Sequence, residues 1–246
     1  MPISRIAYTI VACAAAVLLL AFAARADAPA PVPVVKLTGS ITPSHPPVAP
    51  GTPLHVGLHV RFSSDPPGGD FVLQGVDFFF HSDVRFNSAL FPSCNASRLR
   101  KANGFLRVCP KGSLIGTGSA AGRAVALNIA AGGKLMMFNG PGGRSVTLNL
   151  SIVRPAQLNV TWSDPVTYVP GSHLIVIKER DPVQLQSILG GDIDVTRIDL
   201  DIGVTRVVHG KRRGYVEAGH CAGGMLHTKY YFKGGVTTTA DLKRPC

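Results

Sequence analysis

The chain has 246 residues, of which 46% are hydrophobic and 16% are charged, with 27 glycines, 19 prolines and a formal net charge of +11. So little charge, combined with so much glycine and proline, excludes a coiled coil, a helical repeat and an acidic disordered protein. The hydrophobic content is enough for one core or two small ones.

The first 26 residues have the pattern of a secretory signal peptide. Arg5 precedes a nearly uninterrupted apolar run from 6 to 24, and Ala24-Arg25-Ala26 places small residues where signal peptidase requires them. We expect cleavage before Asp27 and a protein that is secreted or associated with the cell envelope. Two alternatives are an uncleaved anchor, since the run approaches the length of a membrane span, and a lipoprotein modified at Cys13.

The mature chain begins with residues 27–33 (DAPAPVP), which are typical of a flexible leader rich in proline and alanine. Residues 34–246 contain no linker of domain size and no internal repeat. We therefore expect a single domain, with a boundary between 153 and 164 as the alternative. The first strand is expected from Leu54 to Phe62, where apolar and polar residues alternate strictly.

Short apolar stretches separated by Gly, Pro and Asn turns follow along the rest of the chain. They predict an all-β fold, an antiparallel β-sandwich-like domain with one or two short helices. In the longest stretch, 193–208, the apolar positions change from odd to even, which predicts a β-bulge near Thr196 and Arg197. Helices are expected at 95–103 and directly after Asp181-Pro182. The other strands are expected at 71–80, 113–127, 134–138, 145–153, 157–162, 173–178 and 225–232.

Four cysteines remain after removal of the signal peptide: Cys94, Cys109, Cys221 and Cys246. An even number in an exported chain indicates disulfides, and the lack of close C-x-x-C pairs argues against zinc. Four cysteines allow three pairings. We expect the sequence-local one, Cys94 with Cys109 and Cys221 with Cys246, because each closes a short loop.

The sequence lacks the G-x-S-x-G, H-E-x-x-H, C-x-x-C and G-K-[ST] signatures, so we expect neither enzymatic activity nor a cofactor. His55 and His59 would stand about 13 Å apart on a strand, too far to share one ion, and are expected to face solvent. An acidic cluster is the one calcium candidate, although it has no EF-hand spacing. The simpler interpretation is a polar strand edge with Arg197 and Arg206. The cluster comprises Asp192, Asp194, Asp199 and Asp201.

Basic residues are concentrated in two groups. They form either a solvated positive surface or a contact surface for an anionic envelope polymer or a membrane surface. Nucleic acid is not an expected partner, because no base-stacking motif is present. We also expect the protein to be a monomer. The first group surrounds the first cysteine loop and comprises Arg98, Arg100, Lys101, Arg107 and Lys111. The second lies at an expected hairpin tip and comprises Lys211, Arg212 and Arg213.

Residues 109–120 (CPKGSLIGTGSA) resemble the C-P-x-x-S-x-I-G-T-G-x-A signature of exported, uncharacterised actinobacterial proteins. The tail resembles their closing pattern, with YYFKGG at 230–235 between Cys221 and Cys246, and departs from it at 223–225, where an aromatic residue is expected. The resemblance covers roughly 91–246. It implies an all-β protein with disulfides and no known activity.

These features predict an exported structural or adhesive protein of the cell envelope. The first alternative is a carbohydrate- or lipid-binding module, which would need an aromatic platform or an apolar cavity, although Trp162 is the single tryptophan. The second is a secreted hydrolase whose residues converge only in three dimensions. Its candidates are Asp192, Asp194, His173 and His220.

Overall fold

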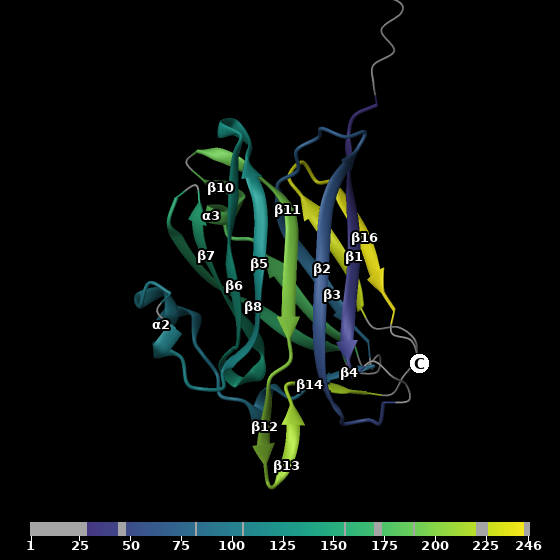
Figure 1. Ribbon diagram of the computed structural model, residues 1–246, viewed down its shortest axis with the longest axis vertical. Helices are drawn as coiled ribbons and strands as arrows, with labels where there is room; N and C mark the ends of the chain where they lie inside the picture. The colour runs from purple at the N-terminus through teal and green to yellow at the C-terminus, as the bar shows by residue number, and fades with distance from the viewer. Residues whose placement is uncertain are drawn as a thin grey trace, which may run out of the picture. The chain divides into compact units, whose positions relative to one another are not determined.

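The computed structural model describes residues 29–43, 48–81, 83–104, 106–154, 156–169, 174–188, 190–219 and 226–243 (Figure 1). The chain from Val32 onward clusters as one compact unit. Antiparallel strands make up most of its described part, with two short α-helices, which confirms the predicted all-β class. The predicted signal peptide, Cys13, Cys221 and Cys246 lie outside the described residues.

The main sheet has the strand order β16-β15-β3-β9-β8-β7-β6-β5-β11-β2-β14-β4, with β1 paired to β2 and β10 to β11. A separate hairpin joins β12 and β13. The strands are β1 (Val32–Thr42), β2 (Pro53–Asp65), β3 (Leu73–Phe80), β4 (Val84–Phe86), β5 (Leu114–Ala124), β6 (Ile129–Asn139), β7 (Ser145–Arg154), β8 (Leu158–Val169), β9 (Leu174–Arg180), β10 (Ser187–Ile188), β11 (Gly191–Ile202), β12 (Thr205–Val208), β13 (Lys211–Gly214), β14 (Val216–Ala218), β15 (Leu226–Phe232) and β16 (Thr237–Leu242). The helices are α2 (Ala96–Lys101), α3 (Val183–Gln186) and the 3-10 turns η1 (Ser88–Leu90), η2 (Leu106–Val108), η3 (Val125–Leu127) and η4 (Pro141–Gly143).

The sheet curls so that its two halves face each other across a shared apolar core, and β1 comes to lie beside β16 (Figure 1). Glycine is required at this approach: a Cβ on Gly39 would come within 2.6 Å of Leu242 Cδ2 and 2.8 Å of the Gly57 carbonyl oxygen. On β5, a Cβ on Gly118 would lie 2.1 Å from the Asp199 carbonyl oxygen. The glycines of the IGTG sequence therefore let β5 and β11 approach closely.

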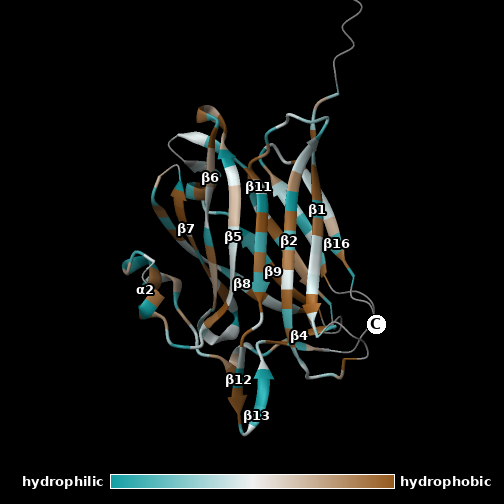
Figure 2. Ribbon diagram, viewed as in Figure 1, coloured by the Kyte–Doolittle hydropathy of each residue, from teal (hydrophilic) through white to brown (hydrophobic). Residues whose placement is uncertain are grey.

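Period-two alternation correctly predicted β2. Its inward-facing residues Leu54, Val56, Leu58 and Val60 are at most 4% exposed, whereas His55 and His59 are exposed. Figure 2 shows hydrophobic and hydrophilic residues alternating along β2 and β11. The predicted bulge is confirmed as well, because the register of β11 against β5 shifts between Val195 and Arg197.

Several features differ from the predictions. The stretch predicted as one strand at 193–208 is divided into β11 and β12, and β4, β10, β14 and β16 were not predicted. β1 was not predicted, and it begins at Val32, so the last two residues of the predicted leader belong to a strand. Helix α3 begins directly after Asp181-Pro182, as predicted, but covers only Val183–Gln186 and is followed at once by β10. The tip of the β12–β13 hairpin is His209-Gly210, both with positive φ, so the basic residues from Lys211 onward form its second strand.

The alternative domain boundary at 153–164 falls within β7 and β8, which pair from Ser145 with Pro165 to Ile152 with Leu158. Helix α2 confirms the helix predicted at 95–103. It starts where the side chain of Asn95 accepts a hydrogen bond from the Ser97 backbone N–H at 2.8 Å. No helix in the described parts of the chain is long and apolar enough to cross a bilayer.

Candidate functional site

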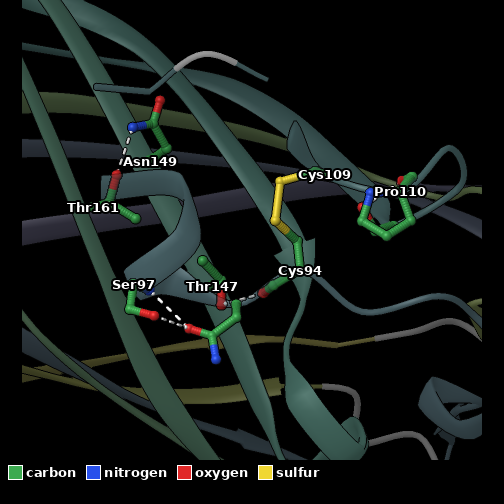
Figure 3. Close-up of a disulfide and its surroundings, with 9 residues drawn as sticks. Cys94, Ser97, Cys109, Pro110, Thr147, Asn149 and Thr161 are labelled. Carbon is green, nitrogen blue, oxygen red and sulfur yellow. Dashed lines mark hydrogen bonds between the residues drawn. A yellow bond between two sulfur atoms is a disulfide. The ribbon is translucent and has the colours of Figure 1, made fainter. Parts of the chain in front are cut away.

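The predicted disulfide between Cys94 and Cys109 is formed, with their Cα atoms 5.2 Å apart (Figure 3). It closes the loop from 94 to 109. We call the longer segment around this loop, residues 91–113 with α2 and η2, the disulfide arm. The arm lies against the outer face of β6–β8, where Leu99, fully buried, packs with Cys94 and Phe138.

Hydrogen bonds fix the arm to the sheet (Figure 3). The Thr147 hydroxyl on β7 donates to the Cys94 carbonyl oxygen at 3.0 Å, and Asn139 Nδ2 on β6 donates to the Phe91 carbonyl oxygen at 2.9 Å. Beneath α2, Asn149 Nδ2 donates to Thr161 Oγ1 at 2.8 Å. The arm is therefore a fixed part of the fold.

The exposed surface of the arm is basic. All five predicted cations of the first group, Arg98, Arg100, Lys101, Arg107 and Lys111, are exposed. The wider sequence shows why this region is so positive: residues 84–163 contain ten Lys and Arg but no Asp or Glu. Most of this acid-free segment is contiguous, because β5, β6, β7 and β8 are consecutive neighbours in the sheet; β4, at its start, pairs instead with β14.

The second basic group behaves differently. Arg213 donates to both carboxylate oxygens of Glu217, at 2.8 and 2.9 Å, and the backbone N–H of Gly214 donates to the same carboxylate at 3.0 Å. Desolvation opposes ionisation of Glu217, but the hydrogen bonds from Arg213 outweigh it and lower the pKa of this carboxyl. Arg213 is thus engaged within the fold, while Lys211 and Arg212 are exposed.

The acidic cluster is dispersed among basic partners. Asp199 on β11 contacts His59 and Arg61 on β2, each at 2.9 Å, and Asp201 contacts His55 at 2.9 Å. Desolvation opposes ionisation of Asp199, but the hydrogen bonds from Arg61 and His59 outweigh this effect and lower the pKa of its carboxyl group.

The two remaining members of this cluster also have their own partners. Asp192 pairs with Lys233 at 2.9 Å, and Asp194 accepts a hydrogen bond from the Phe71 backbone N–H at 3.2 Å. Within the described residues, no group of three or more His, Cys, Asp and Glu side chains is arranged to hold a metal ion. The hydrolase candidates His173 and His220 lie outside the described residues.

A second site, which the sequence did not indicate, lies inside the curled sheet. A cavity of about 110 Å³ is walled almost entirely by apolar side chains, among them Leu148, Ile177 and Ile198. Asp164 on β8, together with Glu179 and Asp181 at the end of β9, also lines it, beside the indole of Trp162. We call these three acidic residues the carboxyl cluster.

The buried carboxyl groups of this cluster lack some of their hydrogen-bond partners among the described residues. Asp164 is 3% exposed, and its Oδ2 has no hydrogen-bond partner among the described residues; the same holds for Glu179 Oε1 and Trp162 Nε1. Desolvation is the main cause that raises the pKa of Asp164 to about 7 and that of Asp181 to about 6. Desolvation and the neighbouring acids also raise the pKa of Glu179 well above its ordinary value.

No protein family, curated protein sequence or solved structure matches this chain. The resemblance of residues 109–120 to exported actinobacterial proteins therefore stays a prediction from the motif. The chemistry of the two sites follows from the chain's own residues alone.

Those residues support two kinds of binding. The disulfide arm presents fixed positive charge to solvent, which suits an extended anionic partner. The carboxyl cluster offers hydrogen-bond acceptors inside an apolar cavity, which suits a small ligand that carries donors. The first site was visible in the sequence as a basic loop. The second depends on how β8 and β9 pair, because Val166 opposite Ile177 brings Asp164 near Glu179.

Proposed function

We propose that the protein is exported and attaches to an anionic polymer of the cell envelope through the basic surface of the disulfide arm. The observation that carries this proposal is the absence of any acidic residue from 84 to 163, alongside ten basic ones. Acidic side chains elsewhere in the fold would neutralise these basic residues if they formed ion pairs with them. Among the described residues, however, Arg98, Lys101 and Lys111 have no ion pair.

The rigidity of the disulfide arm supports an adhesive role. Its disulfide and its hydrogen bonds to β6 and β7 hold the cations in place before a partner binds. Side chains on a preorganised backbone lose less conformational entropy on association than those on a mobile loop. A row of individually weak contacts can then add up to retention on a repeating polymer.

The character of the arm surface favours a polymer over a lipid bilayer. Stable attachment to a membrane surface usually combines basic residues with apolar side chains that insert between lipids. Among the described residues of the arm, Leu106 is the one large hydrophobic side chain that is clearly exposed, at 38%. The contact is therefore mainly electrostatic.

A salt series on two matrices tests this function. The full protein is applied to immobilised polyphosphate and to phosphatidylglycerol vesicles, both at low ionic strength. We expect retention on polyphosphate that is lost as salt is raised past about 0.1 M, where the Debye length falls to about 10 Å. Retention by the vesicles alone, or retention that is independent of salt, would contradict the proposal.

A further inference from the structure

We propose that the cavity inside the curled sheet binds a small apolar amine, with the ammonium group among Asp164, Glu179 and Asp181. This site is separate from the disulfide arm, and the inference does not rest on envelope attachment. It follows from three independent observations: an apolar cavity, acceptor atoms without partners that line it, and a cavity lining without cations.

The cavity fits a compact ligand. Its volume of about 110 Å³ is somewhat smaller than the apolar cavity of roughly 150 Å³ that admits benzene in an engineered protein. A second cavity of about 70 Å³ adjoins it and shares Asp181 and Leu185. Small residues, among them Ala120, Gly132 and Gly133, line this second space. A ligand with one ring or a short alkyl chain would fill the first cavity and could extend into the second.

The polar end of the cavity has few donors: among the described residues, the Trp162 indole N–H and the Arg180 backbone N–H are those that interact with Asp164. Asp164 is almost fully buried, yet its Oδ2 has no partner within the described residues, and neither has Glu179 Oε1. No Lys, Arg or His lines the cavity within the part of the chain that the structure describes. A buried carboxylate without a counter-charge is costly, so an ammonium with its three N–H donors is the group that best completes this end.

Trp162 adds to the preference for a cation. Its side chain lines the cavity close to Asp164 and Glu179, and an aromatic ring near an ammonium group adds to the attraction for a cation. Its Nε1–H lacks a partner with normal hydrogen-bond geometry among the described residues. A ligand with a carboxylate or a phosphate would place a further negative charge beside the three acids. Because like charges repel, anionic ligands are excluded.

In the absence of ligand, protons stabilise the carboxyl cluster. Burial and the neighbouring acids raise the pKa of Glu179 well above its ordinary value, and desolvation raises the pKa of Asp181 to about 6 and that of Asp164 to about 7. Among the described residues, Tyr215 is the one other titratable group that lines the cavity, and burial raises its pKa. Arg180 lies between Glu179 and Asp181 in the chain but turns to the opposite face of the sheet, where it pairs with Asp77 at 2.7 Å. An ammonium would replace protons on the carboxyl cluster, so its binding strengthens as pH rises through 6 to 7.

The single tryptophan provides a direct reporter. Because Trp162 is the only tryptophan in the chain and lines this cavity, its fluorescence responds to a ligand bound there. The full protein is titrated with benzylamine, with the neutral isostere benzyl alcohol and with benzoate. We expect a saturable change with benzylamine that is about tenfold tighter than with benzyl alcohol, or about 1.4 kcal/mol. Benzoate should cause no saturable change.

Two variants test the carboxyl groups. Asp164→Asn and Glu179→Gln keep side-chain size but remove the acids, and each should weaken benzylamine binding about tenfold while leaving benzyl alcohol unchanged. Asp192→Asn is the matched control, because Asp192 pairs with Lys233 at the surface. For the unmodified protein, benzylamine affinity should be higher at pH 8 than at pH 5, on either side of the Asp164 pKa of about 7.

Equal affinity for benzylamine and benzyl alcohol in the unmodified protein would overturn the proposal, as would the absence of a saturable response. This comparison requires no variant, so it decides the matter even if a substituted protein fails to fold. Because salt and polyphosphate act on the disulfide arm, failure here leaves the envelope proposal standing.

Discussion

Asp164 and Glu179 come from neighbouring strands and face the same apolar cavity, yet Oδ2 of the first and Oε1 of the second have no hydrogen-bond partner among the described residues. Desolvation, joined by the mutual repulsion of acids, raises the pKa of both. A hydrophobic residue of similar size at either position would avoid this cost. These acids therefore lower the stability of the fold near neutral pH, which is typical of residues kept for binding.

The stability of the protein should fall as pH rises from about 5 to 8. The pKa of Asp181 is raised to about 6 and that of Asp164 to about 7 from an ordinary 3.8, so the folded state holds protons that the unfolded state has released. Their contribution is present at acidic pH and is lost as pH passes through these values. The pKa values of Asp199 and Glu217 are lowered, so their contributions are lost as pH falls further. Thermal melts should show a maximum near pH 4, close to the ordinary pKa of the acids, and a melting temperature that rises from pH 5 to pH 8 would contradict this.

Removing one acid of the carboxyl cluster should stabilise the protein at pH 8. Glu179→Gln eliminates a desolvated, repelled carboxyl, and we expect a gain on the order of 1 to 2 kcal/mol in the free energy of unfolding by urea. At pH 5 the gain should be smaller, because burial and the neighbouring acids raise the pKa of Glu179 well above its ordinary value and so favour its neutral form as the pH falls. Asp192→Asn serves as the control and should change little at either pH. A loss of stability in Glu179→Gln at pH 8 would show that the charged form is needed.

Glu217→Gln should destabilise the protein by about 2 to 3 kcal/mol, because it leaves Arg213 without its charged partner. The Glu217 side chain is fully buried and holds the base of the β12–β13 hairpin to β14 through Arg213 and the Gly214 backbone. Chemical denaturation measures the effect. The exposed neighbour Arg212 provides the control, and an equal effect of Arg212→Gln would argue against a specific role for the buried pair.

Loss of the Cys94–Cys109 disulfide should lower the free energy of unfolding by roughly 3 kcal/mol, the chain-entropy value for a loop of about 15 residues. The double variant Cys94→Ser, Cys109→Ser should be as stable as the parent measured in reductant, apart from the effect of reducing any second disulfide.

Peptide mapping without reduction should show Cys221 linked to Cys246. A peptide that joins either of these cysteines to Cys94 or Cys109 would disprove the predicted pairing.

The sequence alone was sufficient to predict those strands that bury one face and expose the other. Alternation along 54–62 and the change of phase near Thr196 are local signals, and the side chains of β2 and β11 follow them. β1 was not predicted, because its residues include Pro33 and Gly39 and are mostly exposed, which is typical of a strand that pairs with one neighbour; its described pairing is with β2. The short disulfide loop was also a local feature.

The sites depend on contacts between distant residues, which composition cannot reveal. In the sequence, Lys178-Glu179-Arg180-Asp181 looks like a charged turn. In the structure this stretch lies at the end of β9, so that Glu179 and Asp181 line the cavity while Arg180 points to the opposite face of the sheet. Likewise, the buried environment of Glu217 shows that Arg213 is a structural residue. The basic surface was predictable, because charges spread over consecutive strands in one sheet stay together.

The most direct test of envelope attachment compares two variants of equal charge. One carries Arg98→Gln, Lys101→Gln and Lys111→Gln on the disulfide arm, and the other carries Lys36→Gln, Lys211→Gln and Arg212→Gln elsewhere on the surface. The dissociation constant for polyphosphate, measured at low salt, should rise about tenfold for the arm variant, since each exposed ion pair contributes up to about 1 kcal/mol. It should change little for the other. Equal weakening in both variants would show that net charge alone, and not the disulfide arm, holds the polymer.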